Sequence, residues 1–449
     1  MSTDASSPAT SSGGDPVAAT DVLIVGGGLA GLACATRLCR AGRSVRLLEA
    51  TDRVGGRVRT EQCDGFQIDH GFQVLLTAYP ACRQLLDYDA LRLRAFEPGA
   101  LIRLPGRWGR LSDPWRRPRH LWATAVSPVG SLADKARIVR LRRAASRGTL
   151  PELFARPQRS TLEHLRAFGF SEGMIDRFFR PFLGGIFLER DLQTSSRMFE
   201  FVFRMFSAGA AALPAEGMAA IPRQLAARLP AGTVQLQETV ETIDGTHVTT
   251  TAGQRYQAGN LVIATEAPAA ARLLGAPDLD CRWQATHAFS FAAPVSPSDE
   301  PILMLDGTGQ GPINHLAVVS RVAPSYAPEG RALISANVVG ACEDPQDLLP
   351  AVRAQLREWF GVAVDRWDFL QVTSVPFALP EQTVERLEAV GPAGGQAWPA
   401  AGHDHLWVCG DHRETSSIQG AMQSGLEVAE ALLSAAGSPA GQPPPERRN

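Results

Sequence analysis

The sequence predicts an α/β fold in which a parallel βαβ unit opens the chain and a mixed α+β part is inserted further along. Three patterns predict this fold. An apolar run at residues 21–25 stops at a glycine cluster, a helical pattern follows over 29–41, and a second short strand covers 44–48. With 449 residues, the chain is long enough for two or three lobes.

The first glycine cluster has the spacing of a Rossmann-type dinucleotide-binding loop. Gly26, Gly28 and Gly31 form G-x-G-x-x-G between a strand and a helix, which permits a tight turn, close approach of a pyrophosphate, and helix packing on the strand. Glu49 ends the second strand, where a carboxylate would accept hydrogen bonds from a ribose. We expect these loop residues at the pyrophosphate: Gly26, Gly28, Leu29, Ala30 and Gly31. NAD and FAD both fit this pattern, and the alternative is a glycine turn without a ligand.

A second glycine cluster favours FAD over NAD as the ligand. The stretch "EATDRVGGRVRT" resembles the superfamily of flavin amine oxidases, protoporphyrinogen oxidases and phytoene-type desaturases. The resemblance implies that Ala50, Arg53, Gly55, Gly56 and Arg57 lie along FAD, with Arg57 near the pyrophosphate. A planar guanidinium suits a diphosphate, which gives the resemblance a physical basis.

The following stretch, "DGFQIDHGFQVLL", is similar to the Asp-x-Gly segment of the same superfamily. The resemblance implies that Asp69 and Gly71 lie near the flavin. His70 between them has two interpretations, a base in the reaction or a structural histidine beside a turn. The sequence favours the structural interpretation.

The end of the chain carries a third motif, "HLWVCGDHRETSSIQGAMQSGLEVAEALL". It resembles the superfamily's C-terminal flavin motif, which implies that Gly410 and Asp411 contact the ribityl phosphate region. Ser417, Ile418 and Ala421 would then place a helix start at the isoalloxazine, with Ser416 or Ser417 as its cap. An ordinary amphipathic helix is the alternative. Cys409 stands where a small buried residue is expected, so we expect FAD to bind non-covalently.

The middle of the chain also resembles the superfamily. A helix within "LPAEGMAAIPRQLAARLP" precedes predicted hairpins and an apolar strand, and the resemblance implies that Val240 lies near the adenine. The expected FAD-binding domain is discontinuous, with segments 20–84, 206–280 and 401–437. The expected substrate domain comprises a helical segment, 85–205, and a mixed segment of strands and helix, 281–400. Residues 1–19 and 438–449 are expected to be disordered tails.

Composition excludes several classes of protein. The net charge of −2 gives no sign of nucleic-acid binding, and the sequence shows no apolar stretch of bilayer length. The seven cysteines are scattered without a Cys-x-x-Cys pair, which favours a reduced, cytoplasmic setting without structural zinc or another metal.

The branch of the superfamily is predicted from residues that the chain lacks. Amine oxidases of this superfamily commonly use a lysine and an aromatic cage, whereas the only lysine here is Lys135 and Ser417 stands where a cage tyrosine is expected. Trp398 and Trp407 are the remaining aromatic candidates. The sequence therefore favours an FAD-dependent oxidoreductase that dehydrogenates a bulky apolar substrate by hydride transfer, with carotenoid-like polyenes ahead of porphyrinogens. The alternatives are a flavin amine oxidase and a lipid-binding escort similar to dissociation inhibitors. No catalytic acid or base is identified.

Residues 103–147 contain twelve basic residues and two acidic ones, interleaved with Trp108, Trp115 and Trp122. This composition suits a surface that contacts anionic lipid, or a site that receives the carboxylates of a porphyrin. A solvated arginine face is the alternative.

Overall fold

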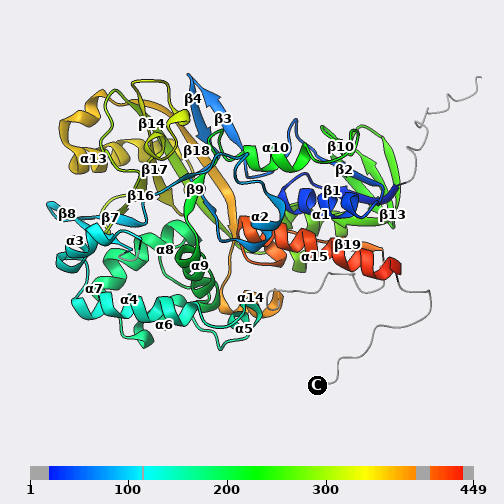
Figure 1. Ribbon diagram of the computed structural model, residues 1–449. Helices are drawn as coiled ribbons and strands as arrows, with labels where there is room; N and C mark the ends of the chain where they lie inside the picture. The colour runs from blue at the N-terminus through cyan, green and yellow to red at the C-terminus, as the bar shows by residue number, and fades with distance from the viewer. Residues whose placement is uncertain (1–19, 114–115, 391–404, 438–449) are drawn as a thin grey trace, which may run out of the picture.

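A computed structural model describes residues 20–113, 116–390 and 405–437 (Figure 1). The expected tails at 1–19 and 438–449, and the tryptophans Trp115 and Trp398, lie outside the described residues. Two large sheets organise the described chain, with a group of short helices beside the second sheet (Figure 1).

The first sheet joins three remote segments of the chain. Its parallel strands lie in the order β10-β2-β1-β13-β19, and β13 continues into the antiparallel strands β12 and β11. These strands are β1 (Thr20–Val25), β2 (Val45–Leu48), β10 (Val234–Gln235), β11 (Val240–Asp244), β12 (His247–Thr250), β13 (Arg255–Ile263) and β19 (Leu406–Val408). Because they are parallel, the carboxyl ends of β1, β13 and β19 meet at one edge, which is where ligands bind in such sheets.

The second sheet is antiparallel apart from one parallel pair, β7 with β15. Its order is β18-β14-β17-β16-β15-β7-β8, with strands β7 (Gly99–Leu104), β8 (Arg107–Ser112), β14 (Trp283–Ala293), β15 (Leu303–Asp306), β16 (Ile313–Val318), β17 (Ala332–Val339) and β18 (Asp368–Pro380). Helix α13 (Leu349–Phe360) covers one face, where Phe289, Phe291 and Leu356 share a separate core. The other face contributes side chains to the main core of the molecule.

Two smaller sheets connect these layers. They are formed by β3 (Thr60–Cys63) with β4 (Phe66–Asp69), and by β5 (Leu75–Leu76), β9 (Ala211–Leu213) and β6 (Arg94–Ala95). Since β9 follows the helical segment and pairs with strands that precede it, the chain returns to the first domain through this sheet.

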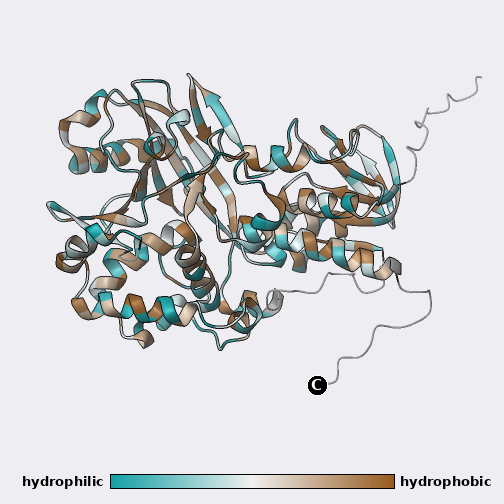
Figure 2. Cartoon of the chain, in the orientation of Figure 1, coloured by the Kyte–Doolittle hydropathy of each residue, from teal (hydrophilic) through white to brown (hydrophobic). Residues whose placement is uncertain are grey.

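Helices α1 (Leu29–Arg40) and α15 (Ile418–Gly437) lie side by side on the first sheet (Figure 1). The described helical segment contains α3 (Leu121–Val126), α4 (Leu132–Ala145), α5 (Leu150–Phe154), α6 (Thr161–Phe168), α7 (Glu172–Met174), α8 (Arg180–Phe187) and α9 (Ser196–Ala208). The remaining described α-helices are α2 (Pro80–Leu85), α10 (Ala220–Ala226), α11 (Ala267–Leu274), α12 (Val319–Val322) and α14 (Val384–Val390). Hydrophobic and hydrophilic residues alternate along the outer helices in Figure 2, as expected for helices with one face on the core.

Three of the short helices begin at capping boxes. The cap residues are Ser131, Thr149 and Ser160. The side chain of each accepts a hydrogen bond from the backbone N–H of the third helical residue, and its own backbone N–H donates to the acidic side chain of that residue. A capping box satisfies two backbone donors that would otherwise lack partners. These local signals explain why an arginine-rich segment with little apolar periodicity still forms defined helices.

The helical expectation for residues 85–205 is wrong over 94–112. This stretch forms β6 and the β7–β8 hairpin, which extends the second sheet. The hairpin pairs with β15, about two hundred residues later in the chain. Pairing at such a distance is not encoded in local periodicity, so the pattern of residues alone misses it.

No helix among the described residues is long and apolar enough to cross a bilayer.

The contact between α1 and α15 depends on Gly425. A Cβ atom there would lie 2.1 Å from the carbonyl oxygen of Ala30. We expect Gly425→Ala to separate the two helices and to lower the free energy of unfolding by about 1–3 kcal/mol, measured by denaturant titration. Gly173→Ala is the control, because a Cβ there meets nothing within 4 Å. Equal stability of the two variants would contradict this packing.

Candidate active site

One cavity of about 1220 Å³ begins at the glycine loop after β1 and continues between the second sheet and the helices α8 and α9. Its volume exceeds the roughly 300–1,000 Å³ typical of pockets for a single small ligand. The cavity therefore has room for a dinucleotide in one half and a substrate in the other.

Most of the cofactor residues predicted from the sequence line this cavity. They are Gly26, Gly28, Leu29, Ala30, Glu49, Ala50, Gly55, Gly56, Arg57, Gly71, Val240, Gly410, Asp411, Ser417, Ile418 and Ala421. They come from both ends and the middle of the sequence, so the fold brings remote motifs to one place.

Three predicted residues do not line the cavity. Gly31 lies behind the loop, where a Cβ would come within 2.1 Å of the Gly26 carbonyl oxygen. Arg53 is half exposed and pairs with its neighbour Asp52 at 3.0 Å. Asp69, predicted to lie near the flavin, is held inside the protein by other side chains.

The Asp69 carboxylate has a structural role. It accepts hydrogen bonds from Thr60 Oγ1 at 2.5 Å, from the Met218 backbone N–H at 2.9 Å and from Tyr326 Oη at 2.9 Å. Burial raises the pKa of Asp69 to about 6, although these three donors oppose the shift. Thr60 belongs to the adjacent strand β3, whereas Met218 and Tyr326 lie 149 and 257 residues away, so Asp69 ties the turn that follows it to two distant segments.

The glycine loop fits a pyrophosphate. Helix α1 has no side-chain cap at its N-terminus, so its first backbone N–H groups are available to an anion. A Cβ at Gly28 would meet no protein atom within 4 Å and would instead occupy the cavity. Only glycine therefore leaves this space to a ligand.

Glu49 closes the nucleotide end of the cavity. One carboxylate oxygen accepts the Gly27 N–H at 2.7 Å, and the other accepts the backbone N–H and the hydroxyl of Thr51 at 2.9 and 2.8 Å. The carboxylate is thus fixed by the backbone of the loop that it faces. Oε1 already accepts two hydrogen bonds, whereas Oε2 accepts one and retains acceptor capacity for a ribose hydroxyl.

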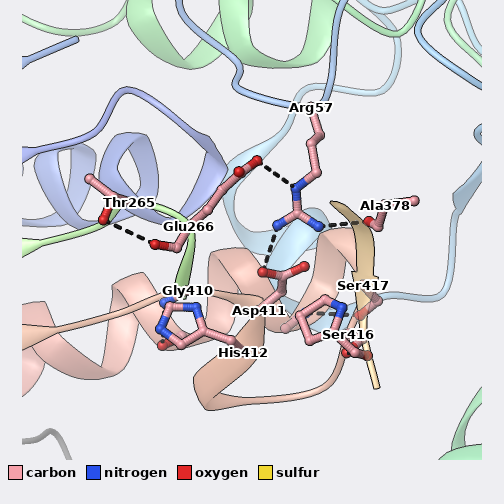
Figure 3. A network of polar contacts seen from close by, with 12 residues as sticks. Arg57, Thr265, Glu266, Ala378, Gly410, Asp411, His412, Ser416 and Ser417 are labelled. Carbon is pink, nitrogen blue, oxygen red and sulfur yellow. Dashed lines mark hydrogen bonds and ion pairs between the residues drawn. The ribbon is translucent and has the colours of Figure 1, made fainter. Parts of the chain in front are cut away.

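Arg57 joins the first and last motifs (Figure 3). Its guanidinium donates to Asp411 Oδ1 and to the carbonyl of Ala378, both at 2.7 Å, and lies 3.4 Å from Glu266 Oε1. Burial alone would lower the pKa of Arg57, but the charges of Asp411 and Glu266 outweigh burial and raise it. Arg57 is therefore a permanent positive charge beside the glycine loop.

The start of α15 points into the same cavity. Ser417 Oγ accepts the Gly420 N–H at 3.0 Å and caps the helix, whereas Ser416 Oγ donates to the Pro380 carbonyl. The positive end of the helix dipole then favours negative charge in the cavity. The Cys409 thiol is fully buried behind this motif, and burial raises its pKa to about 12.

The structure adds site residues that the sequence did not reveal. Glu266 follows the carboxyl end of β13, a position in parallel sheets that could have identified it. Tyr79 lines the cavity with Ser417, and the Ser417 side chain is near enough to lower the pKa of the Tyr79 hydroxyl in part, so an aromatic side chain does lie beside the serine. No local signal indicates this contact. Trp407, one of the aromatic candidates, is buried in the core and does not line the cavity.

The substrate half of the cavity is largely apolar. Its walls include these side chains of the helical segment and the second sheet: Phe178, Phe182, Ile186, Val202, Phe203, Phe206, Leu303 and Leu305. Among the described residues no cluster of three His, Cys, Asp or Glu side chains is arranged to hold a metal ion.

Three features meet in one cavity: an open Rossmann loop, the capped N-terminus of α15 and an apolar chamber. Together they are typical of a flavin-dependent oxidoreductase. The comparison with known families agrees, since the model of the flavin containing amine oxidoreductases matches residues 29–433. The chain belongs to this family. At family level, the expected fold and enzyme class are confirmed.

The sequence matches to individual relatives cover less of the chain than the family model does. It is 32% identical over 87 residues to 4,4'-diaponeurosporene oxygenase of Staphylococcus aureus (strain USA300), which is 19% of this chain and 17% of the relative. It is 26% identical over 181 residues to coproporphyrinogen III oxidase of Propionibacterium freudenreichii subsp. freudenreichii, which is 37% of this chain and 31% of the relative. The matched stretches thus span less than a third of these relatives.

Similarity of fold covers nearly the whole chain. A solved structure provisionally named protoporphyrinogen oxidase, from Exiguobacterium sp. 255-15, superposes with a TM-score of 0.71 at 18% identity. The superposition covers 93% of this chain and 99% of that one. At this identity the likeness shows a shared fold.

We expect Arg57→Ala and Glu49→Ala to weaken flavin binding. Each substitution removes a charged group from the nucleotide half of the cavity, and Arg57→Ala also leaves Asp411 buried without its partner. The dissociation constant for added FAD, measured by titration of the apoprotein, should rise on the order of ten- to a hundredfold. Arg40→Ala, at the exposed end of α1, is the control. Unchanged affinity in both cavity variants would overturn the assignment.

Proposed function

We propose that the chain binds FAD non-covalently and dehydrogenates a bulky, hydrophobic substrate by hydride transfer to the flavin. The observation that supports this most directly is the single cavity that connects the glycine loop with an apolar chamber. When bound, FAD would supply the hydride acceptor. The protein would supply the cradle, the fixed charge of Arg57 and a dry wall that orients the substrate.

The chamber supports an apolar substrate over a cationic amine. Its aromatic side chains come from α9 and from the turn and helix before it, at Phe178, Phe182, Phe203 and Phe206. Two relatives act on a polyene and a porphyrinogen, as their names state. We therefore place carotenoid-like polyenes ahead of porphyrinogens, and both ahead of amines.

A panel of compounds tests this proposal. The FAD-loaded protein is mixed without oxygen with 4,4'-diaponeurosporene, coproporphyrinogen III, benzylamine or putrescine, and the flavin absorbance is followed. We expect the polyene or the porphyrinogen to bleach the flavin and the amines to leave it oxidised, because the chamber offers apolar contacts. Bleaching by an amine alone would instead identify an amine oxidase.

An escort role would require no flavin chemistry. Purified protein that is colourless and does not take up added FAD would favour that alternative. Yellow protein that releases FAD on denaturation would support non-covalent binding and oppose it.

We also propose that the Arg-rich segment, residues 103–147, contacts an anionic membrane surface from the cytoplasm. Trp122, Val126 and Leu132 are 77%, 59% and 69% exposed, and Arg119 nearby is also exposed. Apolar side chains next to arginines are typical of an interfacial site. Ser112, Arg116 and Ile138 of the same segment line the cavity, so an apolar substrate would have a short path from the membrane.

Vesicle sedimentation tests the membrane contact. We expect the protein to sediment with phosphatidylglycerol vesicles and not with pure phosphatidylcholine vesicles, since anionic lipid attracts the arginines. The triple variant Trp122→Gln, Val126→Gln, Leu132→Gln should lower the bound fraction at least about tenfold. Val362→Gln is the control, because Val362 is equally exposed but lies outside this segment. Equal binding to both kinds of vesicle would contradict the charge argument.

A further inference from the structure

The backbone around His70 is held on both sides. The preceding residue, Asp69, is fastened by three hydrogen bonds, and the following Gly71 has a positive φ of 84°. The His70 N–H donates to the Arg59 carbonyl at 2.9 Å, and Gln73 Nε2 donates to the His70 carbonyl at 2.9 Å. The backbone that carries the His70 side chain is therefore fixed before any substrate binds.

No hydrogen bond to another described residue affects the His70 imidazole, and the residue lines the cavity and is half-buried. The cavity wall in the described part of the chain contains a second histidine, His315. One nitrogen of that ring is engaged, because Asn314 Nδ2, which donates to the Pro181 carbonyl, also lies 3.1 Å from His315 Nδ1. The other nitrogen, Nε2, is buried and has no hydrogen-bond partner among the described residues. His70 therefore differs from His315 in having both ring nitrogens available.

The position of His70 is at the junction of the two halves of the cavity. Gly71 lies against Val375 and Thr286, and these two side chains line the cavity on the second sheet. On the nucleotide side, the Gln73 side-chain amide donates to the backbone carbonyl of Arg57 at 2.9 Å. A substrate that reaches the flavin from the apolar chamber would pass this segment.

His70 is also in the right protonation state to accept a proton. Burial, followed by the charge of Arg59, lowers the pKa of His70, and Glu61 opposes the shift only in part. The other candidates are less suited. Burial lowers the pKa of His315 to about 3, and it raises the pKa of the Tyr79 hydroxyl, which stays protonated.

We propose that His70 is the general base of the dehydrogenation, an inference that rests on the proposed function. One substrate C–H bond breaks with its electron pair, which leaves as hydride and reduces the flavin. A neighbouring C–H bond breaks heterolytically, its proton goes to a lone pair of the His70 imidazole, and its electrons form the new double bond. The imidazolium then releases the proton to solvent, so atoms and charge balance over the reductive half-reaction, the one that anaerobic bleaching measures.

The kinetic test uses the compound that bleaches the wild-type flavin in the four-member panel. We expect His70→Gln to slow anaerobic bleaching by roughly 10²- to 10⁴-fold, because glutamine keeps the size and polarity but accepts no proton. Added imidazole should partly restore the rate in His70→Ala, a rescue that a structural role would not permit. His247→Gln, on the exposed strand β12, is the control and should behave as wild type.

A chemical test needs no substrate. Diethyl pyrocarbonate acylates free, unprotonated imidazoles, and peptide mass spectrometry locates the product. We expect rapid modification of His70 and of the exposed His247, and little of the buried His315. An unmodified His70 beside a modified His247 would overturn the proposal, since its ring would not be free.

The kinetic outcomes separate the two proposals. Equal bleaching rates in wild type and His70→Gln would reject His70 as the base while the dehydrogenase function stands. Absence of bleaching by every compound would reject the proposed function and the base together. Slow bleaching in His70→Gln with imidazole rescue in His70→Ala would support both.

Discussion

The ion pair between Arg57 and Asp411 is the constraint on which the site depends. Its partners lie 354 residues apart, and the Asp411 carboxylate is almost fully buried. A buried carboxylate without a partner is strongly disfavoured, so the two ends of the chain must meet for the protein to be stable. The same guanidinium binds the Ala378 carbonyl on β18, which ties the second sheet to the first. The cavity is therefore complete only in the assembled fold, and a cofactor that binds there stabilises the assembly.

Glycine residues allow the helices and strands around this ion pair to pack closely. Gly31 and Gly425 bring α1, the first strand and α15 together at distances that no larger residue permits. In the substrate half, Gly184 and Gly185 play the same part, because Cβ atoms there would lie 3.1 and 2.8 Å from the side chains of Asn314 and His315. Both halves of the cavity thus use small residues to place helices, and polar groups are positioned by that packing.

The corrections to the sequence predictions share one cause. The resemblance placed Asp69 near the flavin, and in the structure Tyr326, 257 residues later, occupies one of its oxygens. Residues 94–112 looked helical, yet they pair with β15 and β9. The same distance effect placed Tyr79 beside Ser417, the residue that stands where a cage tyrosine was expected. In each instance the local sequence indicated one role for a residue, and a partner far away in the chain gave it a different role.

The sequence by itself determined the βαβ unit, the glycine loop, Glu49 and the helix that starts at Ile418, because backbone geometry and hydrophobic periodicity are local properties. Its motifs also indicated the family, whose model matches residues 29–433. Only the tertiary structure decided which polar side chains remain free. Asp69 and His70 are adjacent in sequence, but the carboxylate accepts hydrogen bonds from two distant segments, whereas His70 lines a cavity. Hydrogen-bond satisfaction depends on what the whole fold brings within about 3 Å, and no local pattern contains that information.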